Sequence, residues 1–572
     1  MALLQFYPID ISLTVINGST AVLLTGRTPS GDKIVVMDKS FSPYFYVQLK
    51  NNQSLDSVME RLKKLELQAS FGTGRITKTR LTNRLVKGEK ITLVQAFVNI
   101  FFFLPKLAAE AAQWPEVESV HEQDVSVVKK YLLEKNISLS TLTDVYYEPG
   151  NIRTKYPCFN ALRLEQKAAR IIPDIKAFSV KLDLQQIEKD EEAIVAVHIS
   201  SSNLSRTISW KRSENAELVD GELNLLQHFF EMIEHLKPDV IYGRDIHRIF
   251  SMIEERASKY KIKIQLGVDY SGIKIRNSKA YIKGIPLIDI EDYAVRMLTS
   301  RSIISAGSKP DYEFFAELVP YFIEIQRAGF TLQESSQVSA KQVVEAFFIN
   351  ESFASQIAIP QKPTKNIIEL RKQVYSSKKT IPTGIHENIA LLPLGCVAAS
   401  IISEKNISPE TINCSCCAAS APRINFAEGN NCWLCKAKRG FYAKIAQETL
   451  SRYFRIKEMM KNSQQAGLQA RAAILKIVIE MLSSYVNNPS SRWYSPESSQ
   501  LLENATSSLF QDISNKLQNS GLNFIYANND FMLYNYKDKN KASDAAKIIS
   551  ELNSWIDVEK PQLFDNAAII RV

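Results

Sequence analysis

The spacing of apolar and polar residues predicts a series of short buried strands in the first half of the chain. Runs rich in β-branched and aromatic residues, each bounded by turn formers, lie at residues 20–28, 33–38, 44–49 and 193–200. Residues 240–260 begin with a similar run and continue with apolar positions at helical spacing, which predicts a strand followed by a helix. We therefore expect two α/β units in the first half of the chain.

Residues 441–485 have the periodicity of two amphipathic helices. The apolar side chains that share one side are Ile445, Leu450, Tyr453, Ile456 and Met460 in the first helix, and Ile474, Ile477, Val478, Met481, Leu482 and Tyr485 in the second. Residues 462–467 separate the two, so an antiparallel helical hairpin is expected. Arg452 and Arg455 belong to a basic run in the first helix, which suits either a grip on phosphates or an ordinary solvated face.

Two apolar runs within residues 521–534 enclose the turn formers Ala527 to Asp530, which predicts a tight β-hairpin. The turn holds a single carboxylate, that of Asp530. A carboxylate at the tip of such a hairpin can hold a magnesium ion for phosphoryl transfer, but that chemistry depends on more than one carboxylate. The hairpin is therefore either a metal-binding hairpin that has lost a ligand or merely a turn.

Length and composition indicate a soluble protein of several domains. The chain has 572 residues, of which 45% are hydrophobic and 23% charged, and its net charge of +9 mildly favours a polyanionic partner. Its first residues lack a basic segment and meet Asp10 early, so no secretory signal is expected. The most apolar run, residues 93–105, is too short to span a bilayer and is expected to be a buried strand. We expect a cytoplasmic protein without a membrane partner.

Five of the seven cysteines fall within residues 414–435. Cys414 and Cys417 form one Cys-x₂-Cys pair, and Cys432 and Cys435 form a second pair after fourteen intervening residues. Two such pairs are typical of a structural zinc ion bound by four thiolates. Disulfides and free thiols stay open as alternatives, and Cys416 can replace either partner of the first pair.

Short segments along nearly the whole chain resemble, in order, the motifs of archaeal family B DNA polymerases. The segments are "SFSPYFYVQL" (40–49), "HEQDVSVVKKYLLEKNI" (121–137), "SIISEKNISPET" (400–411), "KRGFYAKIAQETL" (438–450), "ARAAILKIVIEMLSSY" (470–485), "SRWYSPES" (491–498) and "YANNDF" (526–531). Each segment alone is a weak signal. Seven segments in the family's order make a strong one.

The resemblance implies a multidomain fold of α/β and α+β parts. The expected parts are an N-terminal domain (1–130), a degenerate RNase H-like 3′–5′ exonuclease domain (131–310), a connecting segment that returns to the N-terminal domain and palm (311–365), a first palm part with a cysteine-rich, zinc-like insert (366–435), helical fingers (436–488) and a second palm part (489–572). The chain ends 42 residues after Asp530, so the resemblance also implies that the thumb is largely absent.

By the same resemblance, the polymerase site has lost most of its carboxylates. Pro393 and Asn528 stand where the family carries catalytic aspartates, while Asp530 is a remnant, and Tyr453 replaces a triphosphate-binding arginine. Magnesium binding at this site is therefore expected to be weak or absent. The residues expected to contact DNA or nucleotide are Arg452, Arg455, Arg471, Lys476, Arg492 and Tyr494.

The exonuclease motifs are degenerate as well. Ser179 and Lys181 stand where the family's first exonuclease motif places Asp and Glu, and Arg248 and Ile249 cover the aspartate of the second. The Tyr-x₃-Asp of the third motif is absent from the shortened region near Asp311. No exonuclease activity is expected. Losses in both sites resemble those of the inactivated archaeal paralogues of the family.

Three functions are compatible with this pattern. The first is a non-catalytic DNA-binding accessory factor in replication or repair, which can also contact other replication or repair proteins. The second is a slow, damage-tolerant DNA polymerase in which Glu480 or Asp538 joins Asp530 in holding magnesium. The third is a structural subunit of a replication or repair complex. A carboxylate within coordination distance of Asp530 would favour the second.

Overall fold

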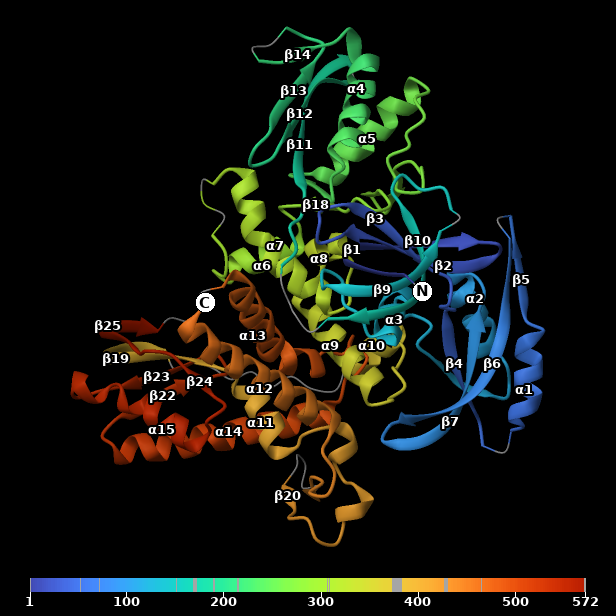
Figure 1. Cartoon of the computed structure of the whole chain (residues 1–572). Helices are drawn as coiled ribbons and strands as arrows, with labels where there is room; N and C mark the ends of the chain where they lie inside the picture. Colours follow the sequence, from blue (N-terminus) through green and yellow to red (C-terminus); the bar gives the residue numbers. More distant parts are fainter. Residues whose placement is uncertain are drawn as a thin grey trace. The chain divides into compact units, whose positions relative to one another are not determined.

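The computed structural model (Figure 1) describes residues 2–51, 53–70, 72–150, 152–167, 172–188, 191–212, 215–305, 307, 309–372, 383–425, 431–463 and 465–569. They form two compact units. Unit 1 comprises Met1–Asn83 and Thr92–Val343, and unit 2 comprises Arg84–Ile91 and Val344–Val572. None of the helices in the described part of the chain is long and apolar enough to cross a membrane.

The first part of unit 1 combines a small barrel with a separate sheet. The closed barrel consists of β1 (Ala2–Ile16), β2 (Ser19–Arg27), β3 (Lys33–Asp38), β10 (Cys158–Gln166) and β9 (Thr143–Pro149). The sheet consists of β5 (Glu66–Ala69), β6 (Gly72–Val86), β7 (Glu89–Val98), β4 (Tyr44–Leu49) and β8 (Val117–His121), and its core includes residues of α1 (Leu55–Lys63) and α2 (Leu104–Ala112). The strands expected at 20–28, 33–38 and 44–49 are confirmed as β2, β3 and β4.

Two expectations for this region are wrong. The apolar run at 93–105 is not one strand, because β7 ends at Val98 and Pro105 opens helix α2, where its missing N–H costs no hydrogen bond. The domain boundary expected at residue 130 separates strands that belong together. Strand β9 pairs with β1 and β10 pairs with β3, and such long-range pairing closes the barrel without leaving a signal in the local pattern.

The second part of unit 1 is a sheet with the order β14 (Glu217–Leu218), β13 (Ser205–Ser209), β12 (Glu191–Ser200), β11 (Ala177–Glu188), β15 (Val240–Gly243) and β18 (Leu287–Asp289). Apolar residues of α4 (Gly221–Leu236) and α5 (Ile246–Lys259) pack on it. The strand expected at 193–200 and the strand and helix expected at 240–260 are therefore confirmed.

The segment expected to connect the domains is divided between the two units. Helices α7 (Asp311–Arg327) and α8 (Leu332–Gln337) belong to unit 1, and the division falls inside α9 (Ala340–Ala354). Burial explains this result, because Phe314, Phe322 and Ile325 of α7 have their side chains inside unit 1.

Unit 2 is built around a mixed arrangement of sheet and helices. Its sheet has the order β22 (Asn523–Ala527), β23 (Phe531–Asn535), β19 (Gly384–Gly395) and β24 (Asp557–Val558), with β25 (Gln562–Ile569) also paired to β19. The helices are α10 (Lys365–Lys372), α11 (Val397–Lys405), α12 (Phe441–Asn462), α13 (Ala466–Val486), α14 (Pro496–Asn519) and α15 (Asp544–Leu552). The predicted helical hairpin (α12 and α13) and the predicted β-hairpin (β22 and β23) are both confirmed.

Candidate functional site

The structure brings the three predicted polymerase-site positions together on the sheet of unit 2. Pro393 of β19 lies opposite Phe531 of β23, and the backbone N–H of Leu394 donates to the carbonyl of Asp530 over 2.7 Å. The side-chain oxygen of Asn528 accepts hydrogen bonds from the N–H groups of Asp530 and Phe531, both at 2.8 Å. Asn528 therefore stabilises the turn itself, as asparagine does in many tight turns.

This geometry leaves one carboxylate among the three positions. Proline has no side-chain ligand, and the Asn528 carbonyl oxygen is engaged by two backbone donors. Only the exposed Asp530 side chain can offer a charged oxygen to a metal ion. Two-metal phosphoryl transfer relies on carboxylates that hold both ions, so these three residues cannot assemble such a centre.

A further strand brings two carboxylates to the same end of β19. Asp557 of β24 pairs with Gly395, and the backbone N–H of Glu559 donates to the carbonyl of Pro393 over 3.3 Å. Sequence reasoning missed both residues. The alternation Asp557-Val558-Glu559 is the one available signal, since a period of two places the two acids on one face of a strand.

The first helix of the hairpin binds the buried Asp557 through two residues one turn apart. The Tyr453 hydroxyl donates to Asp557 Oδ2 over 2.8 Å, and the Lys457 ammonium forms an ion pair with Asp557 Oδ1. Burial, together with the Asp557 carboxylate, raises the pKa of Tyr453 well above its usual range, so its hydroxyl keeps its proton. Tyr453 and Lys457 therefore act as partners of a buried carboxylate in the sheet of unit 2.

The second helix contributes Lys476. Its ammonium lies 3.5 Å from Glu559 and 4.0 Å from Glu480, one turn along the same helix. The buried Cys396 lies close to these acids. Burial and the nearby Asp557 and Glu480 carboxylates raise the pKa of its thiol to about 12. We call these residues, Tyr453, Lys457, Lys476, Glu480, Asp557 and Glu559, the helix–sheet network.

Glu480 and Asp538 were expected as possible substitute magnesium ligands beside Asp530. In the structure each of them has a different partner. Glu480 shares Lys476 with Glu559. Asp538 accepts a hydrogen bond from the N–H of Asn540 over 2.9 Å, at the far end of β23 from Asp530. Five strand residues separate Asp538 from the tip of the hairpin, which is about 16 Å at 3.3 Å per residue. Asp538 is therefore too far away to share an ion with Asp530.

The residues expected to contact DNA fall into exposed and buried groups. Arg455 is exposed, Arg452 is exposed with an ion pair to Glu448 at 3.0 Å, and Arg471 is half-buried. Tyr494 is half-buried, with the Arg371 guanidinium 5.3 Å from its ring centre. The two arginines of α12 thus have the placement that a phosphate contact requires.

Arg492 was expected to bind DNA or nucleotide, and its placement contradicts that expectation. Its side chain is only 1% exposed, its Nε donates to Glu345 over 2.6 Å and its Nη1 donates to the carbonyl of Pro360 over 2.7 Å. A buried guanidinium whose donors bind protein oxygens has a structural role. The motif position alone did not reveal Glu345, which lies 147 residues away in the sequence.

Ser179 and Lys181, the residues expected at the first exonuclease motif, lie in β11 of unit 1. Ser179 is buried, and its hydroxyl lies 2.6 Å from that of Ser200. The Lys181 ammonium lies 2.9 Å from Asp311, and the Arg244 guanidinium lies 3.1 Å from the same carboxylate. Burial alone would raise the pKa of Asp311, but the contacts with Lys181 and Arg244 outweigh it and lower that pKa.

The sequence analysis expected the third exonuclease motif to be absent near Asp311. The structure nevertheless places the Asp311 carboxylate against Lys181, at the position of the first motif. Lysine and arginine side chains neutralise the carboxylate that would otherwise attract a metal ion. Arg248, expected at the position of the second motif's aspartate, is exposed and lies 3.6 Å from Glu192. Two of these cations, Lys181 and Arg244, therefore pair with Asp311 and make its carboxylate a weaker ligand for a divalent cation.

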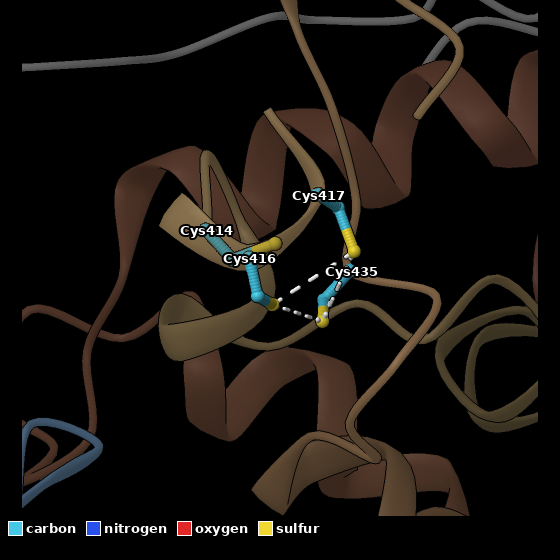
Figure 2. A group of neighbouring side chains, drawn as sticks. All are labelled: Cys414, Cys416, Cys417 and Cys435. Atoms are coloured by element: carbon cyan, nitrogen blue, oxygen red, sulfur yellow. Dashed lines mark hydrogen bonds between the residues drawn. The ribbon is translucent and has the colours of Figure 1, made fainter. Parts of the chain in front are cut away.

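Four cysteines form a cluster that can hold a metal ion (Figure 2). They are Cys414, Cys416, Cys417 and Cys435. The sulfur of Cys416 lies 3.5 Å from that of Cys435, while Cys417 is 3.8 Å from both Cys416 and Cys435. Four sulfurs at about 2.3 Å from a tetrahedral zinc are about 3.8 Å apart, so the cluster has the dimensions of such a site.

Cys432, expected as the fourth ligand, lies outside the cluster, and Cys416 takes its place. Cys432 is buried in the short strand β21 (Asn431–Cys432), where it pairs with Ile424 of β20 (Ile424–Asn425). An isolated antiparallel β-bridge also pairs Ile412 with Leu434, the residue before Cys435. Spacing alone does not specify which way each sulfur points.

The cluster is anchored where α11 ends and α12 begins. The Asn406 amide donates to the carbonyls of Cys435 and Lys438, at 2.7 and 2.8 Å, and accepts from the N–H of Gly440 at 2.8 Å. The N–H of Lys438 donates to the Cys435 sulfur over 3.3 Å. Backbone N–H groups of Lys436 and Ala437 lower the pKa of Cys417 to about 7, which favours the thiolate that binds a metal.

Comparison with known proteins gives both sequence relatives and a structural match. No family model matches the chain. The chain is 22% identical over 526 residues to a DNA polymerase of Thermococcus gorgonarius, which covers 82% of this chain and 63% of that protein. It is 21% identical over 588 residues to DNA polymerase 1 of Pyrococcus abyssi (strain GE5 / Orsay), with 92% and 71% covered. The chain thus spans less than two thirds of the length of the first of these relatives.

The structure of the family B DNA polymerase from the hyperthermophilic archaeon Pyrobaculum calidifontis matches the chain with a TM-score of 0.78 at 15% identity. The match covers 98% of this chain and 78% of that one. The protein therefore has the fold of a family B DNA polymerase. The resemblance to archaeal family B polymerases that was expected from the sequence is confirmed at the level of sequence similarity and fold.

Proposed function

We propose that this protein is a DNA-binding homologue of the family B DNA polymerases that no longer catalyses efficiently and acts as an accessory factor in DNA replication or repair. The observation that carries the proposal is the pairing of Pro393 with the hairpin of Asp530, beside a helix–sheet network that binds Tyr453, Lys457 and Lys476 to protein carboxylates. An incoming triphosphate would have to displace these carboxylates.

The lost carboxylates have a large kinetic effect. If each one supplies on the order of 4 kcal/mol of transition-state stabilisation, two losses lower the rate by roughly 10⁶. Asn528 cannot compensate, because it adds no charge and its oxygen already accepts two hydrogen bonds. Lys181 also disfavours metal binding at the exonuclease-like site, because its ammonium pairs with the Asp311 carboxylate.

DNA binding does not depend on these carboxylates. Phosphate contacts come from cations, and the chain has a net charge of +9 with Arg452 and Arg455 exposed on α12. We infer that α12 contacts the phosphate backbone, together with Arg471 and Tyr494 of the predicted set. Lys476 is a weaker candidate, because it already lies near Glu559 and Glu480.

We also infer that the cysteine cluster holds one structural zinc ion through Cys414, Cys416, Cys417 and Cys435. Four sulfur ligands leave no open position for substrate, so a zinc here would brace the junction of α11 and α12. The sulfur separations of 3.5 to 3.8 Å support zinc over disulfides, since bonded sulfurs lie about 2.05 Å apart.

A slow polymerase is the second candidate, favoured by the position of Glu559. The backbones of Asp530 and Glu559 hydrogen-bond to β19 from opposite sides next to Pro393, so Glu559 adds a second carboxylate-bearing residue at this end of the sheet. A phosphate that draws Lys476 away from Glu559 would free the Glu559 carboxylate for a metal ion. This centre would still lack the carboxylate at position 393.

Primer-template DNA tests the proposal in a single set of reactions. Binding is measured across a salt series with and without magnesium, and extension and strand degradation are followed in the same samples. We expect salt-sensitive binding that magnesium changes little, no rapid extension and no loss of labelled single strand. Absence of binding at low salt would refute the DNA-binding role. Slow extension that is abolished in an Asp530→Ala variant would favour the slow polymerase instead, and fast extension abolished in that variant would refute the loss of catalysis altogether.

A further inference from the structure

The sheet of unit 2 has an outer strand with an open edge. Strand β25 pairs with β19, and no other strand in the described part of the chain pairs with it (Figure 1). Its segment QLFDNAAI holds neither proline nor lysine, the residues that usually protect an edge strand from further pairing. Its single charge, Asp565, lies 2.9 Å from Lys539. The outer edge of β25 is therefore chemically suited to accept another strand.

Part of this edge extends beyond the body of the sheet. Strand β23 pairs with β19 at Ile389–Pro393, whereas β25 pairs with β19 from Gly384 to Leu391. Beyond Glu387, whose carbonyl accepts a hydrogen bond from the Asn535 amide over 2.6 Å, the described residues of β19 and β25 continue as a two-stranded ribbon. A two-stranded ribbon is at best marginally stable in water, so this one gains stability from a third strand.

Apolar side chains of the ribbon are exposed. Ile385 is 84% exposed, and Leu563 and Phe564 are each 40% exposed. The register places Ile385 opposite Ala568 and Phe564 opposite Ile389, and the period of two puts these four side chains on one face. Exposed apolar side chains beside an open edge are typical of a surface where strands pair.

A second copy of the chain matches this edge. Two β25 strands that pair antiparallel are related by a twofold axis, and the alternation of the ladder requires a residue on that axis to face its own copy. An axis at Asp565 would set two carboxylates opposite each other, which is unfavourable. An axis at Asn566 sets two uncharged amides opposite each other and pairs the strand from Leu563 to Ile569, the longest overlap that remains in the described strand.

This register also joins the apolar side chains of the two copies. Phe564 then lies opposite Ala568 of the second copy. Since Ala568 is itself opposite Ile385, a row of apolar side chains crosses four strands, from Ile389 and Phe564 to Ala568 and Ile385 of the second copy. Pairing therefore covers side chains that are exposed in the single chain.

We propose that the outer edge of β25 is a dimerisation surface, where the β25 strands of two copies pair antiparallel about Asn566 and join two sheets into one. Backbone hydrogen bonds along the edge supply affinity, and the apolar row selects the register. Because both copies use the same surface, the assembly closes at two chains. This inference does not depend on the proposed DNA binding.

The test is sedimentation of the full chain without DNA over a roughly hundredfold range of concentration. We expect a dimer that dissociates on dilution. An Asn566→Lys variant sets two ammonium groups opposite each other and should weaken the dimer at least about tenfold. The matched control is Asn523→Lys. It adds the same charge to an exposed residue of β22, at the opposite edge of the same sheet, and should leave dimerisation unchanged.

Disulfide cross-linking gives a second readout of the same contact. Opposite residues of an antiparallel pair have Cα atoms about 5.5 Å apart, which is within the reach of a disulfide. Asn566→Cys should therefore form a cross-linked dimer under mild oxidation, whereas Asn523→Cys should not. The unmodified chain, which carries the exposed Cys416, measures the background.

The outcomes separate the possible occupants of the edge. A monomer at every concentration would overturn the proposal, and so would a dimer that Asn566→Lys leaves intact. Equal weakening by Asn566→Lys and Asn523→Lys would reduce the effect to charge and overturn it as well. A monomer that binds a synthetic peptide of residues 562–569 would replace the second copy with an extended strand of a different protein. None of these results bears on DNA binding, which is measured separately.

Discussion

The hydroxyl of Tyr453 donates a hydrogen bond to the buried carboxylate of Asp557 over 2.8 Å and so connects helix α12 to the sheet of unit 2. Hydrogen bonds to charged groups contribute more than neutral ones, and an unpaired buried carboxylate is costly. Asp557 keeps only Lys457 as a side-chain partner once the hydroxyl is removed.

A Tyr453→Phe variant should therefore lower the free energy of unfolding of unit 2 by about 2 kcal/mol. The control is Tyr312→Phe, which removes an exposed hydroxyl that donates to Glu313 and should have a much smaller effect. Chemical denaturation of both variants measures the difference. Equal, small effects would show that the Tyr453–Asp557 contact does not stabilise the fold.

Arg492 gives a second prediction, because its burial assigns it to the core. An Arg492→Gln variant should lose about 3 kcal/mol of stability, since it leaves the mostly buried Glu345 without its partner. Arg455→Gln, which changes an exposed side chain, should leave stability unchanged and weaken DNA binding instead. Denaturation measures the stability of both variants, and DNA titration measures their binding. A stable Arg492→Gln variant that binds DNA weakly, beside a destabilised Arg455→Gln variant, would contradict this assignment.

The cysteine cluster can be tested with a matched pair of substitutions. The geometry predicts that Cys416→Ser lowers zinc content and stability, whereas Cys432→Ser leaves zinc content unchanged. The paired Cys-x₂-Cys spacing predicts the opposite result. Metal analysis of protein purified without chelator should find about one zinc per chain in the unmodified protein and in the Cys432 variant. A folded, zinc-free unmodified protein would rule out a structural zinc.

The ion pair between Lys181 and Asp311 predicts a pH dependence. Because Lys181 and Arg244 help to lower the folded-state pKa of Asp311, the carboxylate stabilises the fold above its unfolded pKa of about 3.9. That contribution disappears as the pH falls through the lower folded-state pKa. Lys181 is 57% exposed, so its share of the stability is about 1 kcal/mol or less.

A Lys181→Met variant should therefore be less stable than the unmodified protein at pH 7, and the difference should vanish toward strongly acidic pH. Lys211→Met serves as the control, because the Lys211 ammonium donates to the uncharged side chain of Gln185. Its effect should not depend on pH in this range. A Lys181 effect of constant size at every pH would contradict the role assigned to Asp311.

Local patterns predicted the elements that carry the site, because those elements depend on local periodicity. The hairpin of Asp530 and the helices α12 and α13 are examples: each has a turn or break bounded by regularly spaced apolar residues. The positions of Pro393 and Asn528 followed from the resemblance, and the pairing of β19 with β23 brings them together.

Local patterns could not predict which distant segments of the chain come together. Strand β24 has only two residues, and the alternation Asp557-Val558-Glu559 is too short to predict which strand it pairs with, yet this segment brings Asp557 and Glu559 to the end of β19. Similarly, the choice of Cys416 over Cys432 depends on side-chain direction within a folded loop. These contacts form only when distant segments meet, so they require the tertiary structure.

The most direct test of the central claim is single-nucleotide incorporation with primer-template DNA saturated by protein, in magnesium and in manganese. The proposal predicts that the DNA is bound but that the unmodified protein extends it no faster than an Asp530→Ala variant. A variant with Pro393→Asp and Asn528→Asp should remain slow, because Tyr453 and Lys457 still bind Asp557. Rapid incorporation by the unmodified protein that disappears in the Asp530→Ala variant would contradict the account and identify an active polymerase.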